Sequence, residues 1–188
     1  MKKVTAILIL TSFIQINMNA QQKLKADTEK TTLSWLGEKV LGQHTGTVNL
    51  DSGWLHWDDN RIAKGEFKID MTSIETDEKM AKLEGHLKSD DFFGVDKYPV
   101  SVIEIIESTS FENGTGTVKG NLTIKDSTHP VEFKATIQKE EEGLRFFANI
   151  VIDRSKYNVR YGSGSFFSNL GDKTIYDEFK LKVNLLVN

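Results

Sequence analysis

Hydrophobic and polar residues alternate along most of the chain, which is the pattern of β-strands that bury one face. In residues 115–124, for example, Val118, Leu122 and Ile124 fall on one side together with Gly120, and polar residues fall on the other. Consecutive runs of this kind are expected to pair as antiparallel strands. The expected strands cover residues 31–36, 45–50, 54–57, 62–71, 100–110, 115–124, 130–139, 144–152 and 175–185.

Clusters of small and polar residues between these runs predict turns. Asp-Ser-Gly at residues 51–53, Asp-Asp-Asn at residues 58–60 and the acidic stretch ending in glycine at residues 140–143 are each rich in turn-forming residues. We therefore expect the chain to end one strand and begin the next at each of these three places.

One segment has a helical period. Met80, Leu83 and Leu87 are spaced as on one face of a helix, and the acidic residues just after Thr76 favour a helix start, with Thr76 as its N-cap. We expect a single helical insertion around residues 77–93. A series of strands with one helix in a single domain predicts an all-β fold, either a sandwich or a closed barrel. A barrel of roughly eight strands either fills its interior with side chains or holds one small ligand, and the pattern leaves both open.

The amino-acid composition excludes several classes of function. The chain has 24 Lys and Arg against 27 Asp and Glu, a net charge of -3 and a pI of about 5.8, which argues against nucleic-acid binding. The absence of cysteine excludes disulfide scaffolds, thiolate metal sites and cysteine nucleophiles. The four histidines are far apart and form no zinc-binding motif. We therefore predict no metal, no cofactor and no catalytic residue.

The first twenty residues predict export. Lys2 and Lys3 precede an apolar run at residues 4–16, and small or polar residues follow up to Ala20, as in a secretory signal peptide. The apolar run is shorter than the roughly 20 residues that a membrane-spanning helix needs. We expect a signal peptide at residues 1–20, one domain at residues 21–188, and a periplasmic or secreted protein.

Four motifs in order resemble the YceI-like family of polyisoprenoid-binding proteins: FKIDMTSI at residues 67–74, EGHLKSDDFF at 84–93, DKYPVS at 96–101 and GNLTIKDSTHPVEF at 120–133. The resemblance covers nearly the whole chain after residue 20. It implies a lipocalin-like, extended, eight-stranded antiparallel β-barrel that binds a polyisoprenoid, of the isoprenoid quinone or polyprenyl type, or a similar long-chain amphiphile. It leaves open a transient membrane contact and a homodimer.

The resemblance and the alternation together select residues for the site. Ala135 and Ala148 are singled out because small side chains in neighbouring strands would leave room for a ligand. The expected apolar tunnel and mouth consist of Phe67, Ile69, Leu83, Leu87, Phe92, Phe93, Leu122, Phe133, Ala135, Ile137, Phe146, Ala148, Ile150, Phe179 and Leu181. The candidate contacts to a polar headgroup are His86, Ser89, Lys97 and Tyr161.

Three other readings remain open. A tunnel for a long chain also suits a fatty acid or fatty amide, because residue types do not distinguish these from isoprenoids. An enzyme acting on a lipid would use His86 with Asp90 and Asp91 as acid and base. A purely structural domain would have a filled core.

Overall fold

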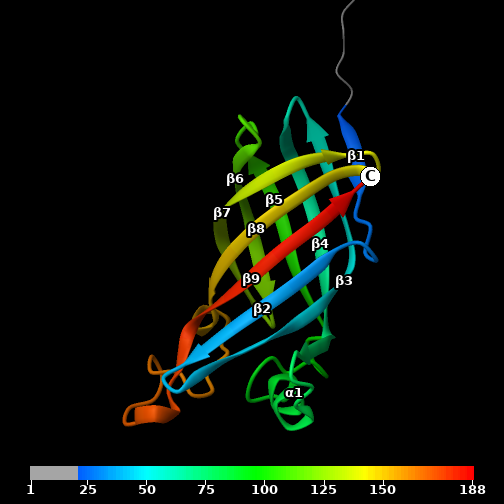
Figure 1. The fold of residues 1–188 in the computed structure, drawn as a ribbon. Coiled ribbons are helices and arrows are strands. Elements are labelled where there is room, and N and C mark those ends of the chain that lie inside the picture. The colour runs from blue at the N-terminus through cyan, green and yellow to red at the C-terminus, as the bar shows by residue number, and fades with distance from the viewer. Residues whose placement is uncertain (1–20) are drawn as a thin grey trace, which may run out of the picture.

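The protein, described by a computed structural model over residues 21–188, is a closed antiparallel β-barrel (Figure 1). The predicted signal peptide lies outside the described residues. The elements in chain order are β1 (Gln22–Lys25), β2 (Thr32–Lys39), β3 (Gly42–Asp58), β4 (Arg61–Thr76), α1 (Ala81–Lys88), β5 (Val100–Ser108), β6 (Thr115–Ile124), β7 (Ser127–Glu140), β8 (Gly143–Asp153), the short 3-10 helices η1 (Arg154–Tyr157) and η2 (Gly171–Lys173), and β9 (Ile175–Val187).

Strand order in the sheet explains the closure. Neighbouring strands follow the order β1-β3-β2-β9-β8-β7-β6-β5-β4, and additional pairing of β3 with β4 joins the two edges. Strands β2 to β9 supply the eight strands of the barrel, so the expected all-β, eight-stranded fold is confirmed. Closure leaves the inward faces of all these strands to form one interior.

Strand β1 extends the barrel wall past the end of β2. It pairs with Trp54–Trp57 of β3, beyond the part of β3 that pairs with β2. The backbone of Lys25 also exchanges two hydrogen bonds with Asn188, at 2.7 and 2.9 Å. The start of the described chain and its C-terminus therefore lie together, at the end of the barrel opposite α1 (Figure 1). Sequence analysis missed β1 because it is four residues long and buries only Leu24.

The prediction of a turn at residues 51–53 is wrong. Strand β3 continues through this stretch, and its pairing register with β4 shifts between Leu50 and Ser52. The extra residue is accommodated as a β-bulge, which uses the same small and polar residues as a turn but keeps the strand running. The other two turns are confirmed. Asp59 and Asn60 join β3 to β4 with φ values of 43° and 62°, as in a two-residue hairpin loop. Two residues, Glu141 and Glu142, separate β7 from β8.

Helix α1 is confirmed but is shorter than expected, and Thr76 is not its N-cap residue. The helix begins at Ala81, after Met80. Thr76 is the last residue of β4; its hydroxyl accepts a hydrogen bond from the Met80 N–H at 2.8 Å. The Thr76 N–H and hydroxyl both donate to the carboxylate of Glu84, each at 2.9 Å. These bonds tie the first turn of α1 to the end of β4. No helix within residues 21–188 is long and apolar enough to cross a membrane.

Three aromatic rings close the barrel at the end where β1 lies, and we call them the aromatic plug. Trp57, Phe111 and Phe146 contact one another with ring centroids 5.5 to 5.7 Å apart. Phe111 is only 2% exposed. At the opposite end, α1 and the segment 158–174 between η1 and β9 surround the barrel opening (Figure 1).

Candidate lipid site

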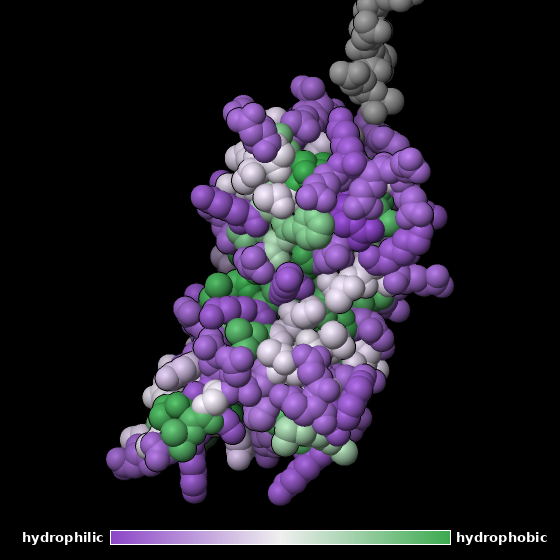
Figure 2. Space-filling model, in the orientation of Figure 1, coloured by the Kyte–Doolittle hydropathy of each residue, from purple (hydrophilic) through white to green (hydrophobic). Residues whose placement is uncertain are grey.

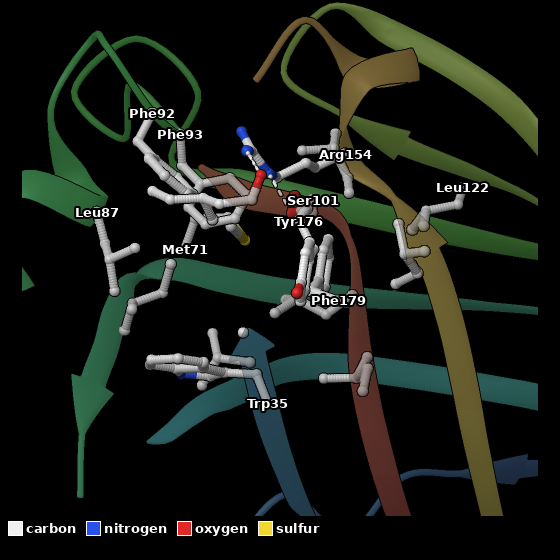
Figure 3. Close-up of a pocket in the computed structure, with 18 residues that line it drawn as sticks. Trp35, Met71, Leu87, Phe92, Phe93, Ser101, Leu122, Arg154, Tyr176 and Phe179 are labelled. Carbon is white, nitrogen blue, oxygen red and sulfur yellow. Dashed lines mark hydrogen bonds between the residues drawn. The ribbon is translucent and has the colours of Figure 1, made fainter. Parts of the chain in front are cut away.

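The barrel interior is hollow and contains two apolar cavities. The outer cavity, beside α1, has a volume of about 120 Å³. Its wall combines inward residues of the strands with Leu87 of α1 and with Phe92 and Phe93, which follow α1 (Figure 3). The inner cavity, toward the aromatic plug, has a volume of about 100 Å³, and every residue of its lining is apolar.

The two cavities adjoin along the barrel. Four side chains line both of them, namely Ile69, Leu122, Ile152 and Leu181. An engineered cavity of about 150 Å³ with similar walls holds one benzene molecule, so these volumes suit about five and about four carbon atoms. Together they offer room for a chain segment of roughly nine carbons. This interior is the strongest candidate for a binding site in the described residues.

Most of the residues selected from sequence line this interior. Phe133 and Leu181 are only partly buried although they point into the barrel, because part of their surface faces a cavity instead of a neighbouring side chain. The outer cavity is lined by the selected residues Ile69, Leu87, Phe92, Phe93, Leu122, Phe179 and Leu181. The inner cavity adds Phe67, Phe133, Ala135, Phe146, Ala148 and Ile150. Ala135 and Ala148 lie directly opposite each other in the β7–β8 pairing.

Two selected apolar residues lie elsewhere. Leu83 and Ile137 are half-buried and pack against the core, and neither lines a cavity. Leu83 belongs to α1, whose next turn presents Leu87 to the cavity instead. Ile137 lies further along β7, beyond the inner cavity's end at Ala135.

The four candidate headgroup contacts also lie outside both cavities. His86 and Tyr161 pack edge to face with ring centroids 4.3 Å apart, which joins α1 to the segment 158–174. The Ser89 hydroxyl donates to the His86 carbonyl at 2.7 Å. Lys97 is exposed, with its Nζ above the ring of Tyr98. Their contact with a ligand headgroup stays a prediction. In the structure, these side chains pack or form hydrogen bonds near the barrel mouth.

The acid-base pair considered for an enzyme is not assembled. Within residues 21–188, no hydrogen bond joins His86 to Asp90 or Asp91, and both aspartates are exposed. The His86 ring packs against Phe92 and Tyr161 instead. In the same residues, no group of three or more His, Asp or Glu side chains is placed to hold a metal ion.

Sequence analysis missed a buried arginine at the outer cavity. Arg154 is 2% exposed, and its guanidinium donates to the carbonyls of Tyr176, Val159 and Ile175 at 3.1, 2.7 and 3.0 Å. A terminal nitrogen lies 3.6 Å from Oδ1 of Asp177. Desolvation lowers the pKa of Arg154, and the Asp177 charge opposes that effect; arginine nevertheless stays protonated in proteins. Arg154 therefore fastens the start of the segment 158–174 to the start of β9, beside the outer cavity.

Ser101 is the second polar residue that sequence analysis missed. It is 4% exposed, lines the outer cavity, and its hydroxyl has no hydrogen-bond partner within the described residues. The alternation of β5 carries a signal for it, since Ser101 shares the inward face with Ile103 and Ile105. A serine in that position interrupts an otherwise apolar face.

Exposed apolar side chains gather around the mouth. A backbone hydrogen bond from Val40 to Thr174 joins the β2–β3 hairpin to the segment 158–174. Figure 2 shows an apolar patch at the end of the molecule where Figure 1 places that segment. The exposed large apolar residues at this end are Val40, Leu41, Met80, Tyr161, Phe166, Phe167 and Tyr176.

Comparisons with known proteins agree with this architecture. Residues 24–187 match the sequence profile of the YceI-like domain. A UPF0312 protein of Pseudomonas putida is 28% identical over 127 residues, which is 65% of this chain and 65% of that protein. A UPF0312 protein of Shewanella denitrificans is 27% identical over 48% of this chain and 47% of its own length. The chain thus aligns with about two thirds of the relatives it matches, or less.

Solved structures share the fold. Burkholderia cenocepacia BcnA aligns over 87% of this chain and 99% of its own, with a TM-score of 0.72 and 21% identity. A polyisoprenoid-binding domain from Saccharophagus degradans, implicated in plant cell wall breakdown, aligns over 88% and 97%, with a TM-score of 0.66 and 14% identity. The Campylobacter jejuni YCEI protein aligns over 100% and 99%, with a TM-score of 0.57 and 20% identity.

Proposed function

Because the chain belongs to the YceI-like family, and because its barrel encloses two adjoining apolar cavities, we propose that it binds and carries the chain of a polyisoprenoid lipid. The observation that carries this proposal is the shared wall of the two cavities, which places them next to each other along the apolar interior of the barrel. The description of the Saccharophagus domain as polyisoprenoid-binding supports it.

An apolar chain can bind in such a site without hydrogen bonds or ion pairs to polar side chains. Each CH₂ group transferred from water to an apolar wall contributes about 0.8 kcal/mol, so a segment of about nine carbons contributes roughly 7 kcal/mol before the cost of association. Selectivity then depends on the width and length of the interior. A chain longer than the cavities hold would project from the mouth or displace lining side chains.

We propose further that the protein acts outside the cytoplasm, in the periplasm or after secretion, and meets membranes at its mouth. The lipid is insoluble, so loading and release need contact with a bilayer or with another carrier. The exposed apolar residues around the mouth would enter the interface of a membrane. A fatty acid or fatty amide remains the alternative ligand, because the same apolar interior accepts a saturated chain.

Lipid identification tests the proposal. Protein secreted or released from the periplasm would be purified without detergent and examined by native mass spectrometry and by analysis of an organic extract. We expect one bound lipid per protein and an isoprenoid in the extract. Recovery of a fatty acid or amide would replace the proposed ligand with the alternative. Protein that is empty, and that also fails to take up added farnesol or palmitate, would refute lipid binding.

A further inference from the structure

The outer cavity reaches the protein surface on the side of the mouth where β2 meets β9. Among the described residues that line this cavity, Tyr176 alone is exposed, and about half of its surface is open to solvent. The pairing of β2 with β9 is irregular at the same place. The register shifts between Gly37 and Lys39, so that one residue of β2 faces three residues of β9. The ladder of hydrogen bonds is therefore interrupted where the cavity is most accessible.

The bulged part of β9 is held from inside the barrel. Arg154 donates to the carbonyls of Ile175 and Tyr176, at 3.0 and 3.1 Å. These carbonyls thus have partners without the help of β2. The two strands are joined by fewer hydrogen bonds here than along the rest of their pairing, which leaves this side of the mouth the easiest to pass.

An exposed apolar surface adjoins this side of the mouth. It consists of Val40, Leu41, Phe166, Phe167 and Tyr176, and we call it the docking lip. Ile175 joins its parts, because it pairs with Lys39 of the β2–β3 hairpin and forms a bridge with Ser163 of the segment 158–174. Leu41 is 65% exposed, and Figure 2 shows the apolar patch at this end of the molecule. Exposed apolar patches of this kind mark places where a protein meets another apolar surface.

The two sides of the mouth differ in charge. The segment 158–174 contains two basic residues, Arg160 and Lys173, and one acidic residue, Asp172. Within residues 21–188, neither cation forms an ion pair, and the Arg160 guanidinium lies 4.9 Å from the ring centre of Phe166 in the docking lip. On the other side of the mouth (Figure 1), residues 75–91 with α1 contain six acidic and three basic residues. An anionic membrane therefore attracts the first side and repels the second.

We propose that the docking lip binds a bilayer that contains anionic lipid, and that a lipid chain passes between this bilayer and the outer cavity beside Tyr176. This inference rests on the proposed function and adds to it the side of the mouth that docks and the class of membrane. The apolar side chains of the lip enter the membrane interface, and Arg160 and Lys173 lie at the level of the lipid phosphates. Helix α1 faces away from the membrane.

Binding to vesicles tests the docking surface. Vesicles of phosphatidylcholine alone would be compared with vesicles of equal parts phosphatidylcholine and phosphatidylglycerol, by flotation at low and at high salt. Each basic side chain near an anionic surface contributes about fivefold in affinity, so wild-type protein should bind the anionic vesicles about 25-fold more tightly. High salt should remove this preference, because it screens the attraction.

Variants locate the charges that matter. Arg160→Gln combined with Lys173→Gln should remove the preference for anionic vesicles. Because Arg160 also packs on Phe166, Lys173→Gln is measured alone as well, and it should lower the preference about fivefold. The matched control is Lys82→Gln combined with Lys88→Gln, which removes two positive charges from α1. It should leave the preference undiminished.

The route of the lipid is tested by blocking one side of the mouth at a time. The chain has no cysteine, so Tyr176→Cys and Met80→Cys each introduce a single reactive group, at positions of similar exposure on opposite sides of the mouth. Each variant would be coupled to a short polyethylene glycol maleimide, which is neutral and too bulky for either cavity. Fluorescence would follow the uptake of a pyrene-labelled fatty acid from anionic vesicles. The label at residue 176 should abolish uptake, and the label at residue 80 should leave it as in the unlabelled variant.

The outcomes separate this inference from the proposed function. Equal binding to both kinds of vesicle, or a loss of preference in the α1 control as large as that in the lip variant, would overturn the docking surface. Uptake blocked only by the label at residue 80 would overturn the route beside Tyr176. Lipid binding stands in each of these cases, because unlabelled protein still takes up the probe. If unlabelled wild-type protein takes up no probe from vesicles or from cyclodextrin, the result counts against the proposed function itself.

Discussion

Ala135→Leu should fill the inner cavity and thereby exclude the ligand. Ala135 is 4% exposed and lines this cavity of about 100 Å³, opposite Ala148. Leucine adds three carbon atoms, which occupy space that three carbons of the ligand chain would otherwise fill. At about 0.8 kcal/mol for each carbon, the ligand loses roughly 2.4 kcal/mol of binding free energy, or about 50-fold in Kd.

Stability should change far less than affinity. Burying three carbons stabilises the folded state, and crowding in a packed core costs typically 1 to 3 kcal/mol. These effects nearly cancel when a cavity receives the added atoms, so the free energy of unfolding should stay within about 1 kcal/mol of wild type. Urea denaturation measures the stability, and competition for a fluorescent fatty-acid probe measures the affinity.

The neighbouring residue provides the control. Thr136 lies on the outward, exposed face of the same strand, so Thr136→Leu adds the same side chain outside the barrel. It should leave the Kd unchanged. The reasoning fails if Ala135→Leu binds the ligand as wild type does, because the ligand would then not occupy the inner cavity. It also fails if the variant loses several kcal/mol of stability, because the space would then not be empty.

Three further measurements test other parts of the structure. Arg154→Met leaves buried carbonyls and a carboxylate without their donor, so unfolding by urea should show a loss of about 3 to 5 kcal/mol; a loss below 1 kcal/mol would contradict the fastening role. The backbone N–H and the hydroxyl of Thr76 hold the pKa of Glu84 below its ordinary value. Stability from this carboxylate is therefore complete above about pH 4.3 and is lost as the pH falls through the lower folded pKa. The Tm difference between wild type and Glu84→Gln should shrink as the pH drops below 4, and a constant difference would argue against this coupling. Replacing both Phe166 and Phe167, which are 41% and 50% exposed, by serine should slow lipid transfer from vesicles at least tenfold while the equilibrium Kd for soluble probes is unchanged; equal transfer rates would place membrane contact elsewhere.

The alternation of residues predicted the inward faces well because a strand sends successive side chains to opposite sides whatever its partners are. Residues such as Phe67 and Phe146 therefore line the interior as expected. Whether the interior is full depends on how eight inward faces meet, and no single strand contains that information. The bulge in β3 was read as a turn for a related reason, since pairing with β4 and not local composition keeps the chain extended there.

The buried arginine could not be predicted from local sequence patterns. Arg154 follows a strand within a charged stretch that reads as an exposed loop. It is buried because it donates to carbonyls of Ile175 and Tyr176, about twenty residues further along the chain. His86 on the helical insertion and Lys97 in the loop after it were selected for their residue types, and the structure leaves them outside the cavities. The inward position of Ser101, by contrast, could have been predicted from the alternation of residues along β5.

The pairing of Lys25 with Asn188 at the plugged end has a practical consequence. A tether joined to the C-terminus would hold the molecule by its closed base, and the opening beside α1 would face the surrounding solution. Layers of protein anchored in this way on a sensor surface would be uniformly oriented toward an overlying suspension of vesicles. Exchange of lipid could then be followed without any chemical attachment near the opening.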